Sequence, residues 1–233
     1  MTHTKLKKVG ITQRLVSAEK GAARDALEQD YVQYYQSLGF SLIPISSALT
    51  DIPNYLDSLD LEGFILSEGN DVNPSLYGGT QTAGVKYADE RDRTEYAILN
   101  YAIEKNIPVI CQCRGTQLLN VFFGGKLTDI KSVPGATNHV ATRHEVHLRE
   151  KVIEHLNTTK FDVNSYHNQG FTEPMVSKDL RIFAIAPDGI VEGIYHPQKR
   201  IAGILWHPER EQSPHKYNDK LVNAFVHGEL FWK

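Results

Sequence analysis

Short apolar runs alternate along the chain with longer stretches in which apolar residues recur at helical spacing. This alternation is typical of a parallel sheet covered by helices. The short runs predict strands, and the longer stretches predict helices. Predicted strands cover 8–12, 40–44, 64–67, 108–112, 181–185, 189–196 and 201–205, and predicted helices cover 22–38, 89–105, 116–123 and 218–231.

The order of these elements predicts one α/β domain over residues 1–233, with a mostly parallel central sheet flanked by helices. A length of 233 residues suits a single compact domain. No repeat, low-complexity tract or linker divides the sequence. The segments 78–89 and 131–138 are polar and contain Gly or Pro, so we expect loops there.

The composition narrows the classes of function. The 25 Lys and Arg against 28 Asp and Glu give a formal net charge of −3, which favours neither nucleic-acid binding nor a basic membrane-binding face. The apolar runs are too short to span a bilayer, and the first residues do not read as a signal peptide. The two cysteines, Cys111 and Cys113, lie too close for a disulfide framework. We therefore expect a cytoplasmic, reducing location.

Cys113 lies where a short apolar strand meets the start of a helix. Such a turn lifts a side chain off the sheet and places it at a helix N-terminus, where the dipole and free N–H groups stabilise a thiolate. Gly115 fits this turn, because a side chain there would crowd the neighbouring strand or the substrate. The N–H of Arg114 would then face the oxyanion of a tetrahedral intermediate.

The local pattern alone leaves other readings of the cysteines open. A free cysteine is more often a buried structural residue than a nucleophile. Cys111, on the predicted strand, is expected to belong to the core. A metal pair formed by Cys111 and Cys113 is disfavoured, because no second pair of ligands matches it.

A second motif supplies a base for the thiol. The apolar strand 201–205 runs into Trp206, His207, Pro208 and Glu209. Side chains two residues apart on an extended chain project to the same side, so His207 and Glu209 can lie close together. Glu209 would accept the Nδ1–H of His207 and leave Nε2 to face the sulfur.

Several ordered segments carry a family resemblance. They read GITQR, ILSEGNDVNPSLYGG, RDRTEYAILNYAIEKNIPVICQCRGTQLLNVFFGGKL, VNSYHNQG, APDGIVEGIYHP and GILWHPER. On these motifs the chain resembles class I glutamine amidotransferase-like proteins, and more narrowly the γ-glutamyl hydrolase group of peptidase C26, which includes the γ-glutamyl-γ-aminobutyrate hydrolases. The resemblance implies a flavodoxin-like fold, no cofactor and no metal.

The resemblance also implies roles for particular residues. It implies a catalytic triad of Cys113, His207 and Glu209 that cleaves a γ-glutamyl amide through a thioester and releases glutamate. An oxyanion hole would be formed by the backbone N–H groups of Gly69 and Arg114. Residues that match positions of the glutamyl-binding site are Gln117, Ser165, Tyr166 and His167.

Three positions depart from the family pattern. Gln112 and Glu68 stand where small residues are usual, and Glu68 would either attract a substrate amine or face solvent. Arg210 follows the His-Pro-Glu segment, where an aromatic residue is common. An arginine there resembles the γ-glutamyl-CDP-amidate hydrolases and would pair with a phosphate-bearing leaving group. Candidate substrates are therefore γ-glutamyl-CDP-amidate and γ-glutamyl-GABA.

Two other functions stay open at this stage. One is a glutaminase subunit that delivers ammonia to a separate synthetase. The other is an inactive binding or regulatory module on the same fold, against which intact Cys113, His207 and Glu209 argue. The sequence leaves the oligomeric state undecided, and a homodimer is the commonest closed assembly.

Overall fold

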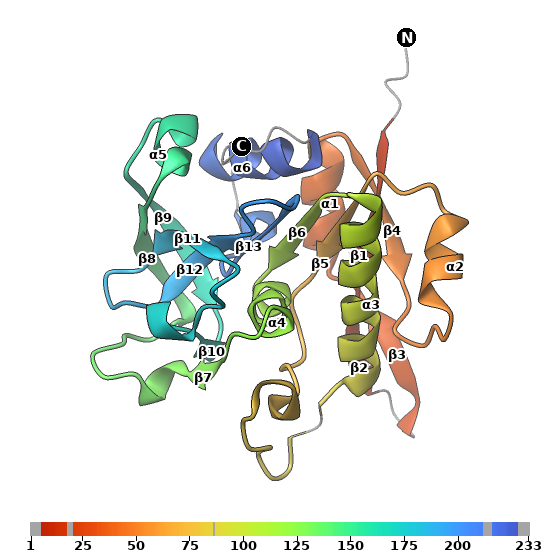
Figure 1. Cartoon of the computed structure of the whole chain (residues 1–233), viewed down its shortest axis with the longest axis horizontal. Coiled ribbons are helices and arrows are strands. Elements are labelled where there is room, and N and C mark those ends of the chain that lie inside the picture. The colour runs from red at the N-terminus through yellow and green to blue at the C-terminus, as the bar shows by residue number, and fades with distance from the viewer. Residues whose placement is uncertain (1–5, 18–20, 86, 212–215, 228–233) are drawn as a thin grey trace.

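The computed structural model describes residues 6–17, 21–85, 87–211 and 216–227 (Figure 1). They form a nine-stranded sheet with the strand order β4-β1-β5-β6-β13-β12-β11-β8-β9. The first five strands in this order are parallel to one another. They are β4 (Phe40–Ile45), β1 (Lys7–Thr12), β5 (Gly63–Leu66), β6 (Val109–Gln112) and β13 (Ile201–Ile204).

Four antiparallel strands extend this parallel part and lie together at one side of the molecule, on the left in Figure 1. These strands are β12 (Val191–Tyr195), β11 (Arg181–Ile185), β8 (Val140–Leu148) and β9 (Lys160–Tyr166). Two small sheets pair β2 (Arg14–Ser17) with β3 (Ala23–Ala26), and β7 (Thr128–Asp129) with β10 (Gln169–Gly170). The α/β fold predicted from the sequence is confirmed.

Helices cover both faces of the sheet, which explains the apolar character of its parallel strands. One core cluster joins the sheet to α1 (Gln29–Ser37), α5 (Lys151–Leu156) and α6 (Lys216–His227). The other joins it to α2 (Ile52–Asp57), α3 (Asp89–Lys105) and α4 (Arg114–Phe122). Neighbouring residues of β6 alternate between the clusters, with Ile110 in the first and Val109 and Cys111 in the second. Cys111 therefore belongs to the core, as predicted.

The predicted helix 22–38 is wrong in its first half. Residues 23–26 form β3, which pairs with β2 in a hairpin, and α1 begins only at Gln29. The Asp25 carboxylate accepts hydrogen bonds from the hydroxyl groups of Ser46 and Ser47, at 2.6 Å each. Strand pairing and these tertiary bonds override the helical preference of an alanine-rich segment.

Other boundaries agree more closely. The predicted helix 89–105 has the bounds of α3, whereas α4 begins two residues earlier than predicted, directly after Cys113. The last helix ends at His227 among the described residues, and the predicted extension over 228–231 lies outside them. Within the described ranges no helix has the length and apolar character needed to cross a bilayer.

Gly115, in the first turn of α4, packs directly against β5. A Cβ atom at this position would lie 2.2 Å from the backbone oxygen of Leu66. Because backbone cannot move aside easily, we expect Gly115→Ala to lower the free energy of unfolding by about 1–3 kcal/mol. Gly63→Ala is the matched control, since its nearest neighbour would lie at 3.5 Å. Equal melting temperatures of the two variants would contradict this packing.

Candidate active site

Cys113 occupies a strained turn between β6 and α4. Its backbone has φ 49° and ψ −108°, a conformation that non-glycine residues rarely adopt. The N–H of Cys113 donates to the oxygen of Ile204 at 2.8 Å, and its carbonyl accepts from the N–H groups of Thr116 and Gln117. Strain of this kind persists only where the surrounding structure enforces it, and it gathers at functional sites. The thiol thus stands at the N-terminus of α4, as the sequence predicted.

His207 and Glu209 lie together just beyond the end of β13. The two atoms His207 Nδ1 and Glu209 Oε1 are 2.6 Å apart, and both side chains are almost fully buried. Burial by itself would lower the pKa of His207, but the Glu209 carboxylate and the Cys113 sulfur raise this pKa to about 10. Nε2 of His207 is buried and makes no hydrogen bond among the described residues. The structure therefore brings Cys113, His207 and Glu209 together.

Two buried amides hold this histidine–glutamate pair, and sequence reasoning gave neither of them a role. Gln112 donates through Nε2 to the second carboxylate oxygen of Glu209 at 3.2 Å. Asn164, on β9, accepts from the N–H of His207 at 2.8 Å and donates to its carbonyl at 2.7 Å. Asn164 is a polar residue in the buried stretch of β9, and this position was the signal from which a role could have been inferred. Gln112 was noted only as a departure from the family.

Loss of the Asn164 amide is expected to loosen His207. In Asn164→Leu the buried N–H of His207 loses its partner, at a cost of about 1–3 kcal/mol. The carbonyl of His207 keeps the N–H of Arg210 at 3.2 Å. We expect a lower midpoint in urea and a lower kcat with a smaller change in KM. Asn138→Ala removes only local bonds of an exposed loop and serves as the control. A variant with wild-type kcat would contradict the positioning role of Asn164.

The two candidate oxyanion donors come from adjacent segments. Gly69 follows β5 with φ +128°, and a Cβ atom there would lie 2.5 Å from Nη1 of Arg91, so only glycine fits. Arg114 is the first residue of α4, and the first N–H groups of a helix have no intrahelical partner. The Arg114 side chain donates from Nε to the oxygen of Asn70 at 2.9 Å. This bond ties the two segments together.

Beneath these donors lies a buried group of alternating charges. Arg114 pairs with Asp92 and Glu95 of α3. Glu95 also pairs with Arg91 at 2.9 Å, and Arg91 donates to the oxygen of Ser67 at 2.8 Å. Removing one member of such a network is strongly destabilising, because it leaves an uncompensated buried charge. The network fixes α3 to the loop that carries Gly69.

Arg91 adds a cation close to the thiol, and sequence reasoning missed it within RDRTEY. Burial lowers the pKa of Arg91 to about 10, while the Cys113 sulfur is among the groups that act in the opposite direction. At neutral pH the guanidinium is thus still charged. Its Nη1 atom is buried and has no hydrogen bond among the described residues. Arg91 therefore places a buried positive charge near the Cys113 sulfur.

The predicted glutamyl-binding residues differ in how far they are exposed to solvent. The Tyr166 ring is 43% exposed and stands edge-on to His207, with ring centroids 5.6 Å apart. Gln117 and His167 are buried, and both donate to the backbone oxygen of Gln169, at 2.8 and 3.0 Å. The hydroxyl of Ser165 is also buried and donates to the oxygen of His139. Of these four predicted residues, Tyr166 alone is exposed, and Ser165 is fully buried.

Four charged side chains form linked ion pairs beside Tyr166 and the turn before Gly69, namely Arg14, Glu28, Glu68 and Arg210. Arg210 forms a two-pronged pair with Glu28, whose oxygens lie 2.8 and 3.0 Å from Nη2, and its guanidinium lies 4.7 Å from the centre of the Tyr166 ring. Glu68 lies 3.6 Å from Arg14 and 3.9 Å from Arg210. Its side chain is only 11% exposed, so Glu68 does not face solvent.

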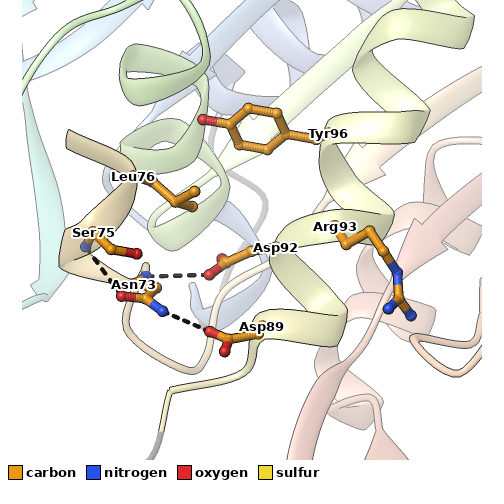
Figure 2. Close-up of a pocket in the computed structure, with 7 residues that line it drawn as sticks. All are labelled: Asn73, Ser75, Leu76, Asp89, Asp92, Arg93 and Tyr96. Carbon is orange, nitrogen blue, oxygen red and sulfur yellow. Dashed lines mark hydrogen bonds between the residues drawn. The ribbon is translucent and has the colours of Figure 1, made fainter.

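Two cavities lie near this assembly. A cavity of about 420 Å³ opens between the 3₁₀ turn Pro74–Tyr77 and the start of α3, and no triad residue lines it (Figure 2). Figure 2 shows the hydrogen bonds from Asn73 to Asp89 and Asp92, which are among its lining residues. A second cavity of about 400 Å³ includes Asn164, Tyr166 and Arg210 in its lining and so adjoins His207.

Comparison with known proteins places this chain in a family. The profile of the family named Peptidase C26 matches residues 8–209. The chain belongs to the Peptidase C26 family. It is 33% identical over 229 residues to the γ-glutamyl-γ-aminobutyrate hydrolase PuuD of Escherichia coli (strain K12), covering 89% of this chain and 87% of that one. It is 31% identical to the glutamine amidotransferase-like protein YvdE of Lactococcus lactis, covering 87% and 88% of the two chains.

Solved structures agree on the fold of this Peptidase C26 member. A GMP synthase subunit protein from Thermoplasma acidophilum superposes with a TM-score of 0.66, covering 97% of this chain and 94% of that one at 18% identity. A glutamine amidotransferase from Methylobacillus flagellatus gives a TM-score of 0.56 at 17% identity, covering 88% and 72%. Identities this low bear on the fold alone. The two superpositions confirm the predicted class I glutamine amidotransferase-like architecture.

Proposed function

We propose that this protein is a cysteine-dependent hydrolase that cuts the γ-glutamyl amide bond of a small compound and releases glutamate. Membership in Peptidase C26 supports a hydrolase that acts on amide bonds. The observation that carries the finer proposal is the placement of Cys113 in a strained turn beside the buried His207–Glu209 pair. A charged imidazole beside sulfur is the arrangement that activates a cysteine nucleophile.

The proposed reaction passes through a thioester. The Cys113 thiolate attacks the γ-carbonyl carbon, and the N–H groups of Gly69 and Arg114 stabilise the resulting oxyanion, each contributing about 3 kcal/mol. His207 gives its Nε2 proton to the departing amine, and the C–N bond breaks. Water then attacks the thioester while His207 takes the water's proton. Glutamate leaves and the thiolate returns.

For the leaving group, we propose an amine-bearing small molecule that lies against Tyr166 and the cavity beside it. PuuD, as its name states, hydrolyses γ-glutamyl-γ-aminobutyrate, and that compound is one candidate here. γ-Glutamyl-CDP-amidate is the other. Arg210 already pairs with Glu28, so a phosphate would have to compete with this carboxylate for the guanidinium. This arrangement gives the nucleotide candidate less support than Arg210 gave it in the sequence.

A substrate screen tests the proposal. The full chain is incubated with γ-glutamyl derivatives of amines, amino acids and a nucleotide amidate, and glutamate release is followed. We expect turnover of at least one γ-glutamyl amide without any partner protein. Hydrolysis of free glutamine that begins only when a synthetase is added would contradict it and favour an ammonia-delivering role. No glutamate release from any compound would favour an inactive module.

A further inference from the structure

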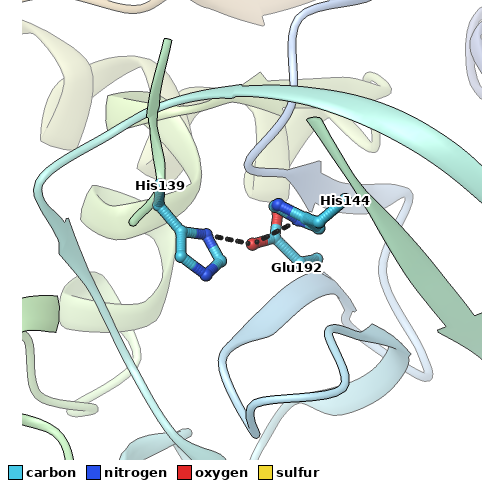
Figure 3. Close-up of side chains that lie close together, drawn as sticks. All are labelled: His139, His144 and Glu192. Carbon is cyan, nitrogen blue, oxygen red and sulfur yellow. Dashed lines mark ion pairs between the residues drawn. The ribbon is translucent and has the colours of Figure 1, made fainter. Parts of the chain in front are cut away.

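Three histidine side chains converge on one buried glutamate in the antiparallel part of the sheet. The atoms His139 Nδ1, His144 Nε2 and His167 Nε2 lie 3.2, 3.3 and 3.4 Å from Oε1 of Glu192. Figure 3 shows His139 and His144 on either side of Glu192. Side chains of His139, His167 and Glu192 are at most 1% exposed, and that of His144 is 13% exposed. Three of the four side chains are therefore shielded from bulk water, and His144 also lines a cavity of about 570 Å³.

None of these short contacts is a hydrogen bond. All three inward nitrogens and both oxygens of Glu192 are buried without a hydrogen-bond partner among the described residues. The ring nitrogens therefore do not point along the line to the glutamate oxygen. A buried carboxylate without hydrogen bonds is costly. One ligand atom each from His139, His144 and Glu192 lies within 4.8 Å of the other two, which is close enough for the three to bind one ion.

Two histidine rings make hydrogen bonds on the side away from Glu192, and these bonds fix the tautomer that a metal requires. His139 Nε2 lies 2.9 Å from Asp188 Oδ2, and His167 Nδ1 lies 3.0 Å from the oxygen of Gln169. Both outer partners accept hydrogen bonds, so the ring protons sit on the outer nitrogens. When these rings are neutral, the inner nitrogens carry the lone pairs that would bind a metal. Metal-bound histidines are typically oriented by such a carboxylate or carbonyl behind the ring.

The spacing of the donors matches a small tetrahedral ion. With metal–ligand bonds of 2.0–2.2 Å, neighbouring ligand atoms of a tetrahedral zinc site are about 3.3 Å apart. The His139 and His144 nitrogens lie 3.2 and 3.3 Å from the Glu192 oxygen, close to that value, and one ligand atom from each of these three residues lies within 4.8 Å of the other two. His167 contacts Glu192 but lies outside this group. Calcium and magnesium prefer oxygen ligands at higher coordination numbers, so a set with two imidazoles and one carboxylate favours zinc.

We propose that His139, His144 and Glu192 bind a zinc ion. The ion has three protein ligands, and its charge compensates Glu192 and Asp188. It joins β8, β12 and the segment that precedes β8. The sequence predicted no metal here, because the donors come from separate segments without a short ligand spacing. The site is distinct from the triad and does not depend on the proposed reaction.

The ion would also brace one wall of the active site, because its ligand Glu192 pairs with His167 at 3.4 Å. Gln169 accepts hydrogen bonds both from His167 and from Gln117, one turn beyond Cys113. Tyr166, which stands edge-on to His207, immediately precedes His167. Zinc loss is therefore expected to loosen this wall as well as to lower the stability of the antiparallel strands.

Metal analysis of the full chain tests the proposal. The protein is purified without metal resin or chelator, and its metals are measured by mass spectrometry. About one zinc ion per chain is expected. Removal by a chelator should lower the melting temperature, and added Zn²⁺ should restore it. Co²⁺ added to the stripped protein should give the strong visible absorption of tetrahedral nitrogen and oxygen ligation.

Variants separate this site from adventitious binding. Glu192→Gln and His144→Ala should lose the zinc and the Co²⁺ spectrum, and their melting temperatures should not respond to Zn²⁺. His147→Ala is the matched control, because His147 is an exposed histidine on the same strand that contacts Glu145. It should bind zinc like the wild type. The proposal is overturned if wild-type protein neither contains nor takes up metal, as a network of protonated histidines would predict, or if Glu192→Gln binds zinc equally well.

Discussion

Cys113→Ala is expected to lower kcat for glutamate release by at least about 10⁴-fold, the order of loss seen when a nucleophile is removed from a catalytic triad. The variant has no atom that can form the thioester. It should fold normally, because the substitution removes one sulfur atom and keeps the Cβ, so the strained backbone at φ 49° meets no new contact. Circular dichroism and a thermal melt establish the fold, and a steady-state assay with the best γ-glutamyl amide gives kcat.

Cys111→Ala is the matched control for this experiment. Cys111 lies two residues away on β6, is fully buried and belongs to the core, and burial raises the pKa of its thiol. Its loss should reduce stability modestly and leave kcat near the wild-type value. Wild-type turnover by Cys113→Ala, or loss of turnover only in Cys111→Ala, would overturn the assignment of the nucleophile.

Glu209→Gln is expected to reduce kcat by about 10²–10⁴-fold and to move the alkaline limb of the pH–rate profile to lower pH. His207 must hold a proton to give to the departing amine. Its pKa is raised to about 10, so wild-type activity should be lost as the pH rises through about that value. The Glu209 carboxylate is the first of the groups that raise this pKa. Without it the proton is lost at lower pH.

The measurement is kcat and kcat/KM across neutral to strongly alkaline pH for wild type and variant. Glu211→Gln is the control, because Glu211 lies on the same segment and contacts Arg143 and Asn164, not the His207 ring. It should leave the alkaline limb in place. An alkaline limb that does not move in Glu209→Gln would show that His207 is not the group that titrates there.

The parts of the site that local chain geometry determines could be predicted from the sequence. His207 and Glu209 were expected to meet because alternate residues of an extended chain share a side, and the 2.6 Å contact confirms this. A side chain at Gly115 was expected to crowd either the neighbouring strand or the substrate, and the closeness of Leu66 shows that it would crowd the strand. The bounds of α3 followed from helical spacing in the same way.

Residues that act through distant contacts could not be predicted. Asn164 and His207 are 43 positions apart, and their mutual hydrogen bonds depend on how β9 lies against the segment after β13. Arg91 reaches Ser67 and the vicinity of Cys113 only because α3 packs beside the parallel strands. The β2–β3 hairpin was missed for a related reason, since pairing between segments overrides local helical preference. No local spacing encodes such neighbours.

The central claim is that the γ-glutamyl group passes to Cys113, and intact-protein mass spectrometry after rapid acid quench tests it most directly. The protein is mixed with an excess of a γ-glutamyl amide that has a good leaving group, quenched during the first turnover, and digested for peptide mapping. We predict a mass increase equal to one glutamyl group on the peptide that contains Cys113, absent in Cys113→Ala and present in Cys111→Ala. Glutamate release at the wild-type rate with no adduct on Cys113 at any quench time, or with an adduct on another residue, would contradict the account.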